Sequence, residues 1–345
     1  MRVLVTGDRG YIGRVLAPFL VAAGHDVVGL DADLYRDCSF GWEPDGPPSI
    51  ERDIRDVSAR DLEGFDAVVH LAGLSNDPLG RLDEGLTYEI NHIASVRLAR
   101  EARVAGVERF LFSSSCSNYG ASGGGSLLDE ESELRPVTAY GRSKVRVEQD
   151  LVALADERFS PTFLRNATVY GVSPRLRLDI VVNNLVAWAY TSGVIRLSSD
   201  GSPWRPLVHV EDVCRAFLAA LEAPRELIHA EAFNVGGSGE NYQIRDVARI
   251  VADTVPGSRV ELAADASPDA RNYRVSCAKL VETLGVGPTW SVRRGAQEHL
   301  AAYREAGLTR ADFEGPRYQR LAQIALLLER GRLDRRLRFV SEIAA

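Results

Sequence analysis

Cysteine is scarce in this sequence, and its few copies are widely spaced. The 345 residues include four cysteines, and no two of them form a C-x-x-C pair. This spacing argues against both a disulfide framework and a zinc site. The six histidines are scattered as well, with no H-E-x-x-H motif. We therefore expect no bound metal.

Long apolar runs and an excess of positive charge are also missing. No apolar run approaches the roughly 20 residues that span a bilayer. The chain starts directly with an apolar segment at Arg2, without the regions of a signal peptide. A formal net charge of −7 gives no reason to expect a nucleic-acid partner. These absences favour a cytoplasmic protein that binds neither membranes nor nucleic acids.

The first half of the chain alternates short apolar segments with amphipathic ones. This pattern predicts a loop over 34–50, helices over 12–23, 86–105 and 139–155, and strands over 2–6, 26–30, 67–72, 109–114 and 161–165. Strands that alternate with helices form right-handed crossovers, and hence a parallel sheet covered on both faces. We therefore predict an α/β protein with a Rossmann-type, doubly wound parallel sheet.

The pattern loosens after about residue 168, which indicates a second, smaller α/β domain for substrate binding. Helices are predicted over 178–191, 244–254, 278–284 and 292–306, a strand end followed by a helix over 208–222, and a short strand over 233–236. We assign 1–168 to the dinucleotide-binding domain and 169–204 with 237–345 to the second domain. Elements near 205–236 are expected to return to the main sheet. A basic amphipathic helix over 317–338 is predicted to serve packing or a subunit contact.

A glycine-rich turn lies between the first predicted strand and the first predicted helix. It reads T-G-D-R-G-Y-I-G over residues 6–13. Gly7 permits a tight turn, Gly10 lets the backbone approach a diphosphate, and Gly13 lets helix and strand pack closely. The N–H groups of the following helix favour an anion. We expect a dinucleotide diphosphate to bind along Gly7, Gly10, Tyr11, Ile12 and Gly13.

An aspartate ends the second predicted strand. Asp31 lies 18 residues after Gly13, near the spacing of about 20 at which a carboxylate binds the adenosine ribose. A carboxylate there accepts from the 2′-hydroxyl and repels a 2′-phosphate, so NAD is favoured over NADP; the alternative is a turn aspartate. Further cofactor contacts are expected at Asp53 and Ile54, for the adenine, and along the strand end at Leu71, Ala72 and Gly73.

Tyr140 and Lys144 lie four residues apart in a predicted helix, which places them on one face. A nearby ammonium stabilises a phenolate, so this pair can provide a general base. The serine-rich strand end at Ser113, Ser114 and Ser115 would complete such a site.

These motifs resemble those of the extended short-chain dehydrogenase/reductases, which include sugar-nucleotide epimerases and dehydratases. The resemblance covers about residues 1–310 and rests on T-G-x-x-G-Y-I-G, Asp31, H-L-A-G, S-S-S-x-x-x-Y-G and Y-G-x-S-K. It implies that Ser115 hydrogen-bonds the substrate oxygen, that Tyr140 takes and returns a proton, and that Lys144 holds the nicotinamide ribose. It also maps Asn91 to a structural or cofactor-side position.

The resemblance extends to a nucleotide-sugar signature in the second half. The segments R-x-x-x-x-Y-G at 165–171, Asn184-Leu185, and R-x-x-x-H-V from Arg205 match the family. They imply a nucleotide-diphosphate sugar as substrate. The residues expected to contact it are Ser117, Thr168, Arg175, Arg177, Asn184, Arg205 and Arg271, where either arginine at 175 or 177 could instead be a solvated charge.

The residues after Ser115 bear on the reaction. Dehydratases of this group carry an Asp-Glu pair there, whereas this chain has Cys116 and Ser117. Dehydration is thus disfavoured, and NAD-dependent epimerisation at C4 through a 4-keto intermediate is the predicted activity. Alternatives are a 4-ketoreductase, a 3,5-epimerase that uses Cys116 as acid and base, and an NAD-sensing protein without catalysis. The family also implies a homodimer through the helices over 86–105 and 139–155, which light scattering would test.

Overall fold

A parallel sheet organises the larger part of the computed structural model, which describes residues 1–41, 45–75, 83–122, 125–197, 199–262 and 272–340. In these residues seven strands pair in the order β11-β7-β5-β4-β1-β2-β3. Their bounds are β1 Arg2–Thr6, β2 Asp26–Asp31, β3 Ser49–Glu51, β4 Ala67–His70, β5 Arg109–Ser115, β7 Ser160–Asn166 and β11 Ala232–Val235. The strand order reverses between β1 and β4, where ligands bind in folds of this kind. The predicted fold class is confirmed.

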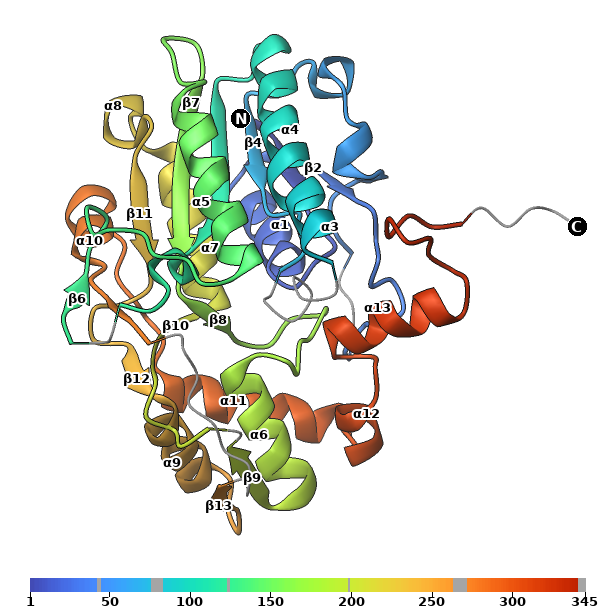
Figure 1. The fold of residues 1–345 in the computed structure, drawn as a ribbon, viewed down its shortest axis with the longest axis vertical. Coiled ribbons are helices and arrows are strands. Elements are labelled where there is room, and N and C mark those ends of the chain that lie inside the picture. Colours follow the sequence, from blue (N-terminus) through green and yellow to red (C-terminus); the bar gives the residue numbers. More distant parts are fainter. Residues whose placement is uncertain (42–44, 76–82, 123–124, 198, 263–271, 341–345) are drawn as a thin grey trace, which may run out of the picture.

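Helices cover both faces of this sheet (Figure 1). Val3 and Val5 of β1 pack on the face that carries α1 Gly13–Ala22 and α7 Val210–Glu222. Leu4, between them in sequence, packs on the opposite face with α4 Ala94–Val104 and α5 Ala139–Val152. The alternation follows from the two-residue period of a strand, and the burial of both faces explains why the strands are continuously apolar.

A second layer lies beyond the carboxyl ends of the sheet strands and has its own apolar core. Its helices are α6 Val181–Ser192, α9 Ile244–Thr254, α11 Val292–Glu305 and α12 Arg310–Glu314. Small sheets join β8 Thr168–Tyr170, β10 Trp204–His209 and β12 Asn241–Gln243, and β9 Val194–Leu197 with β13 Arg259–Leu262. Remaining elements are β6 Leu127–Leu128, β14 Arg274–Val275, α3 Glu84–Tyr88, α8 Arg225–Ile228, α10 Ala278–Leu284, the π-helix η3 Glu89–Ile93, and the 3-10 turns η1 Ile54–Asp56, η2 Ala59–Leu62 and η4 Cys116–Tyr119.

Several predicted elements need correction. Of the elements near 205–236, β11 joins the main sheet and α7 covers it, but β10 belongs to a separate sheet. The loop predicted over 34–50 includes the start of the edge strand β3. The helix predicted over 86–105 is divided by the π-helix η3. The division of domains at residue 168 stays a prediction.

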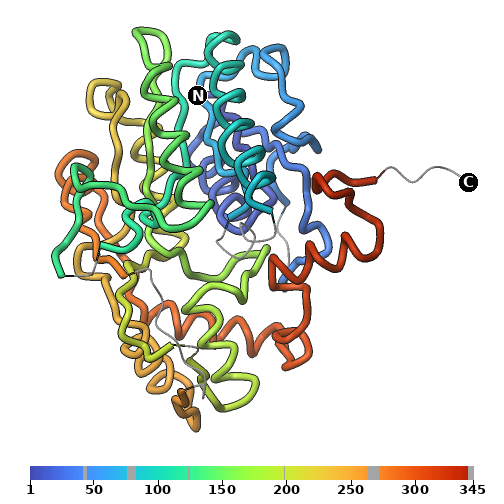
Figure 2. Tube along the Cα trace, in the orientation of Figure 1, coloured from blue at the N-terminus to red at the C-terminus, as the bar shows by residue number. Residues whose placement is uncertain are grey.

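The C-terminal helix is shorter than predicted. It runs as α13 Arg320–Glu329 rather than over 317–338. Gly331 then adopts a φ of 65°, a left-handed conformation that commonly ends helices. The chain folds back through a bridge between Leu333 and Phe339 (Figure 2). Among the helices of the described ranges, none is long and apolar enough to cross a membrane.

Candidate active site

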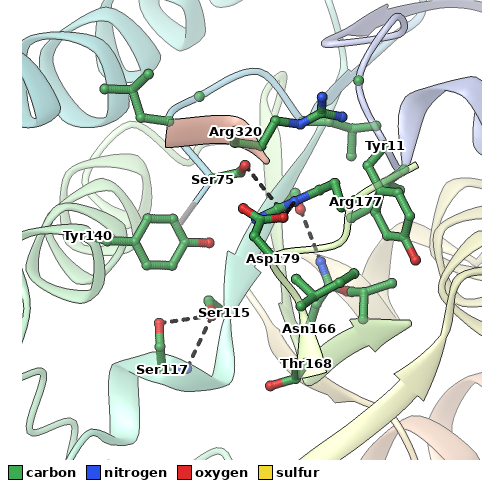
Figure 3. A pocket seen from close by; sticks show the side chains of 18 of the residues that line it. Tyr11, Ser75, Ser115, Ser117, Tyr140, Asn166, Thr168, Arg177, Asp179 and Arg320 are labelled. Atoms are coloured by element: carbon green, nitrogen blue, oxygen red, sulfur yellow. Dashed lines mark hydrogen bonds and ion pairs between the residues drawn. The ribbon is translucent and has the colours of Figure 1, made fainter. Parts of the chain in front are cut away.

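A cavity of about 1050 Å³ opens at the carboxyl ends of the sheet strands. Its walls come from both layers, so residues far apart in sequence face one another across it (Figure 3). The predicted residues that line it are Gly7, Gly10, Tyr11, Ile12, Gly13, Asp31, Asp53, Ile54, Leu71, Ala72, Gly73, Ser115, Ser117, Tyr140, Lys144, Thr168, Arg177, Asn184 and Arg205. The fold therefore gathers most of the predicted cofactor, catalytic and substrate residues around one cavity.

The glycine turn is packed so tightly that side chains would not fit. Gly7 has a φ of 77°, and a Cβ there would lie 2.7 Å from the backbone nitrogen of Ala72. A Cβ on Gly13 would lie 2.1 Å from the carbonyl oxygen of Gly7. These glycines line the cavity directly before α1, where a dinucleotide diphosphate would bind to backbone N–H groups.

Asp31 is held in place at the end of β2. Its carboxylate accepts hydrogen bonds from the backbone N–H of Asp33 at 2.7 Å and of Arg9 at 3.1 Å. Burial raises the pKa of Asp31 to about 6, so the side chain is ionised at neutral pH. The nearby guanidinium of Arg9 forms an ion pair with Asp33, in which Nη1 lies 2.8 Å from a carboxylate oxygen. This corner of the cavity thus suits a ribose hydroxyl better than a phosphate.

We expect wild-type protein to bind NAD at least about tenfold more tightly than NADP, because a 2′-phosphate beside the Asp31 carboxylate meets like-charge repulsion. Asp31→Asn should narrow the difference between the affinities for NAD and NADP. The preference should also shrink as the pH falls through about 6, where Asp31 gains a proton. Calorimetric titration with both dinucleotides measures this, and equal wild-type affinities would contradict the assignment.

The predicted catalytic residues are positioned by β5 and by the first turns of α5. Thr138 caps α5 by accepting the N–H of Gly141 at 3.1 Å. Tyr140 follows in the first turn, and its ring points into the same part of the pocket as Ser115 and Ser117 (Figure 3). The Oγ of Ser115 accepts both the backbone N–H and the hydroxyl of Ser117, at 3.1 and 2.9 Å. The serine is thereby fixed beside the tyrosine.

Lys144 lies one turn after Tyr140 and is buried. Its Nζ donates to the carbonyl of Ser113 at 2.7 Å and lies 5.7 Å from the centroid of the Tyr140 ring. Burial lowers the pKa of Lys144 to about 7, and the carboxylate of Glu148 opposes that shift. A cation at this distance favours the ionised form of the tyrosine.

A buried polar network lies behind these residues. Arg165 of β7 binds Glu148 of α5 in a bidentate ion pair, with Nη2–Oε2 and Nε–Oε1 distances of 2.7 and 3.1 Å. Ser114 and Asn118 also donate to Glu148. Glu148 was not predicted as a site residue, although it follows Lys144 by four residues and so lies on the same helix face. The network joins the helix of Tyr140 to the strand of Ser115.

The proposed proton-exchange role of Cys116 requires correction. Its side chain is fully buried and does not line the cavity. The thiol donates to the backbone oxygen of Arg165 at 3.0 Å, on the inner side of the turn that follows β5. Burial raises the pKa of Cys116 well above its usual value. This position contradicts a 3,5-epimerase mechanism that relies on the Cys116 thiol.

Two further predicted residues lie outside the cavity lining. The Nε of Arg175 donates to the carbonyl of Arg9 at 3.2 Å, so this side chain supports the glycine turn from behind. The side-chain amide of Asn91 accepts the backbone N–H of Leu74 at 2.7 Å and donates to its carbonyl at 2.9 Å. These two hydrogen bonds shape the loop after β4. Both are structural in this geometry. Arg271 lies outside the described residues.

The structure adds lining residues that local sequence patterns did not indicate. They are Tyr35, Ser75, Asp179, Arg196, Tyr273 and Arg320. Arg177 binds Asp179 through two contacts of 2.9 Å and Ser75 at 3.1 Å, so the predicted substrate arginine is already paired. In the part of the chain that the structure describes, no group of three or more metal-ligand side chains gathers.

The fold and this cavity are those of a dinucleotide-binding α/β protein, with the predicted Ser–Tyr–Lys set on the cavity wall. The sequence profile of the NAD dependent epimerase/dehydratase family matches residues 3–236, and the chain belongs to that family. Membership of this family confirms the NAD cofactor that Asp31 predicted.

Individual relatives fit the same assignment. A UDP-glucose 4-epimerase of Yersinia pestis is 30% identical over 332 residues, covering 87% of this chain and 96% of that protein. The structure of TunA, an NAD-dependent NDP-hexosamine 5,6-dehydratase of tunicamycin biosynthesis, is similar with a TM-score of 0.78 at 26% identity, covering 88% of this chain and 98% of that one. MoeE5 in complex with UDP-glucuronic acid and NAD is similar with a TM-score of 0.77 at 27% identity, covering 89% and 100%.

Proposed function

We propose that this protein is an NAD-dependent epimerase that inverts C4 of a nucleotide-diphosphate sugar. The observation that carries the proposal is the convergence of Ser115, Tyr140 and Lys144 on one cavity with the glycine turn. Thr168 of β8, Asn184 of α6 and Arg205 of β10 line the same cavity from elements of the second layer. A guanidinium such as Arg205 suits the diphosphate of a nucleotide sugar.

Each catalytic side chain has a chemical task in this proposal. Tyr140 as phenolate accepts the proton of the C4 hydroxyl and later returns it to the same oxygen. Ser115 donates a hydrogen bond to that oxygen, and Lys144 keeps the tyrosine ionised. NAD held along the glycine turn and Lys144 would supply the acceptor and then the donor for the C4 hydride. The sugar presents its opposite face in between, so the configuration at C4 is inverted without net oxidation.

The side chains next to Ser115 favour this redox route over dehydration. Elimination of water needs a base for a proton on carbon, and Ser117, which faces the cavity, is a poor one. Asp179 also lines the cavity, but its ion pair with Arg177 lowers the pKa of the carboxyl and weakens it as a base. The names of relatives include both epimerases and a dehydratase. Position-specific chemistry, rather than family membership, therefore supports epimerisation.

Heavy water distinguishes the candidate reactions. In C4 epimerisation one hydride leaves and returns, so we expect interconversion of UDP-, dTDP-, GDP- or CDP-sugars without deuterium on any ring carbon. We also expect no net consumption of cofactor. Nuclear magnetic resonance of the products measures the label. Deuterium at C3 or C5 would contradict the proposal in favour of enolisation, and a strict requirement for stoichiometric NADH or NADPH would indicate a 4-ketoreductase.

A further inference from the structure

The C-terminal segment 316–340 forms part of the wall of the dinucleotide-binding cavity. Arg320 and Leu337 line this cavity, although they lie far beyond the family match at residues 3–236. The segment is fixed by an apolar cluster in which Ile324, Leu327, Leu333 and Leu337 meet Leu34, Tyr35, Leu74 and Ile90. Those partners follow β2 and β4, the strands that flank the cofactor site.

Ion pairs at the rim hold the same segment. Arg338 binds Asp56, and Arg336 contacts Glu89 at 2.6 Å. At its start, the carbonyl of Tyr318 accepts the N–H of Leu178 at 2.9 Å. The segment is thus anchored at both ends, and Arg320 lies between these anchors.

Arg320 is a buried cation with spare hydrogen-bonding capacity. Arg320 is 2% exposed, and its Nη1 has no hydrogen-bond partner among the described residues. Nη2 donates to the carbonyl of Arg175 at 2.9 Å, and the guanidinium lies 4.0 Å from the centroid of the Tyr35 ring. A buried donor without a partner is costly, and it usually indicates a missing ligand atom.

Charge around Arg320 is not balanced within this cluster. Asp179 is the nearby acid, and it directs both carboxylate oxygens to Arg177. The charge of Asp179 also acts on Arg320, so two guanidiniums, those of Arg177 and Arg320, share this carboxylate. Burial and the neighbouring Arg177 both lower the pKa of Arg320, but a guanidinium stays protonated in proteins. An anion in the cavity would restore the balance.

The position of Arg320 favours the diphosphate of the dinucleotide over that of the sugar nucleotide. The carbonyl that it binds belongs to Arg175, whose side chain contacts Arg9 of the glycine turn. Tyr35, on which it stacks, follows β2 and Asp31. Figure 3 shows Arg320, Arg177 and Tyr11 on one side of the pocket, and Tyr140, Ser115 and Ser117 on the other. Arg320 is thus linked through Arg175 to the turn that would hold the dinucleotide phosphates, and Arg320 and this turn line the same cavity.

We propose that Arg320 binds a phosphate of the NAD diphosphate, so that the C-terminal segment completes the cofactor site. This rests on the NAD-dependent function proposed above. Backbone N–H groups of the glycine turn would contact one side of the diphosphate. The guanidinium of Arg320 would contact the opposite side. The C-terminal segment is therefore expected to control how tightly the cofactor is retained.

Binding measurements on Arg320→Gln test this proposal. We expect the affinities for NAD and for ADP-ribose, which keeps the diphosphate but lacks nicotinamide, to fall about 10- to 100-fold, as for loss of a charged hydrogen bond. UDP affinity should be unchanged. Arg320→Lys should retain more NAD affinity than Arg320→Gln, and raising the salt concentration should weaken NAD binding more in the wild type than in Arg320→Gln. The control is Arg330→Gln, an exposed position on the same segment.

The outcomes separate this proposal from the function. Unchanged NAD affinity in Arg320→Gln, a loss for UDP but not for NAD, or an equal loss for all three ligands would contradict the role of Arg320. If Arg320→Gln does not fold, a wild-type NAD affinity that does not fall as the salt concentration rises would contradict the charged contact, as would an Arg320→Lys variant that loses affinity for UDP rather than for NAD. Wild-type protein that binds NAD but interconverts no sugar nucleotide would contradict the epimerase function while leaving the Arg320 contact intact.

Discussion

Tyr140→Phe is expected to lower the rate of sugar-nucleotide interconversion by at least about 10²-fold, the usual scale for loss of general acid–base catalysis. The phenyl ring keeps the packing of the first turn of α5 but cannot accept the C4 hydroxyl proton. Because Tyr140 acts in the chemical step, kcat should fall while affinity for NAD changes little. Steady-state kinetics with calorimetric binding measures both quantities.

Tyr190→Phe provides the matched control for this variant. Tyr190 lies in α6, does not line the cavity, and packs against Tyr303 with ring centroids 6.5 Å apart. Removal of its hydroxyl should leave turnover close to that of the wild type. If Tyr140→Phe retained more than a tenth of wild-type kcat, another group would have to transfer the proton, and the assignment of Tyr140 would be overturned.

The second large effect is expected on stability. Arg165→Met should lower the free energy of unfolding by about 3–5 kcal/mol, the scale for breaking a buried ion pair by removing one partner. Arg165 is 6% exposed and Glu148 is 5% exposed, so the carboxylate would be left buried without its cation. Urea unfolding measures this loss of stability, provided that the m value, the dependence of the unfolding free energy on urea concentration, is the same in both proteins.

Two further variants show whether the buried charge is the cause. Glu148→Leu combined with Arg165→Met removes both charges and should recover most of the lost stability, because no uncompensated ion remains. Arg310→Met breaks the exposed pair with Glu314 and should change stability by less than about 1 kcal/mol. A double variant as unstable as Arg165→Met would instead point to lost packing around β7.

The same network links stability to activity. Glu148 lies on the helix that carries Tyr140 and Lys144, and Ser114, which precedes the catalytic serine, donates to it. Arg165 stands on the adjacent strand, where Ser114 pairs with it in register. A change in this network is therefore expected to disturb the spacing of helix and strand. We therefore expect the geometry of the candidate active site to depend on Glu148 and Arg165, two buried charges that do not line the cavity.

Local sequence patterns were sufficient for the features that depend on neighbours in the chain. The main-sheet strands other than the edge strand β3 could be predicted because burial on both faces demands continuous apolar runs. The placement of the glycine turn, Asp31 and the Tyr140–Lys144 pair around one cavity agrees with the sequence patterns, because each proposed function needs a fixed spacing within one or two elements. Predictions failed where one glycine or one π-turn changed the path, as at Gly331 and over Glu89–Ile93.

Only the tertiary structure decided which face each side chain presents to the cavity. Arg175 and Arg177 are two residues apart and equally basic, yet Arg175 supports the glycine turn and Arg177 lines the cavity. Cys116 directly follows Ser115, but the turn after β5 directs its thiol into the protein. Arg320 meets Tyr35 across a long stretch of chain. The sequence by itself determined the chemistry that is available, since residue type and short spacing carry it. Long-range packing decided which groups meet, because contacts between distant segments produce no repeating pattern in the sequence.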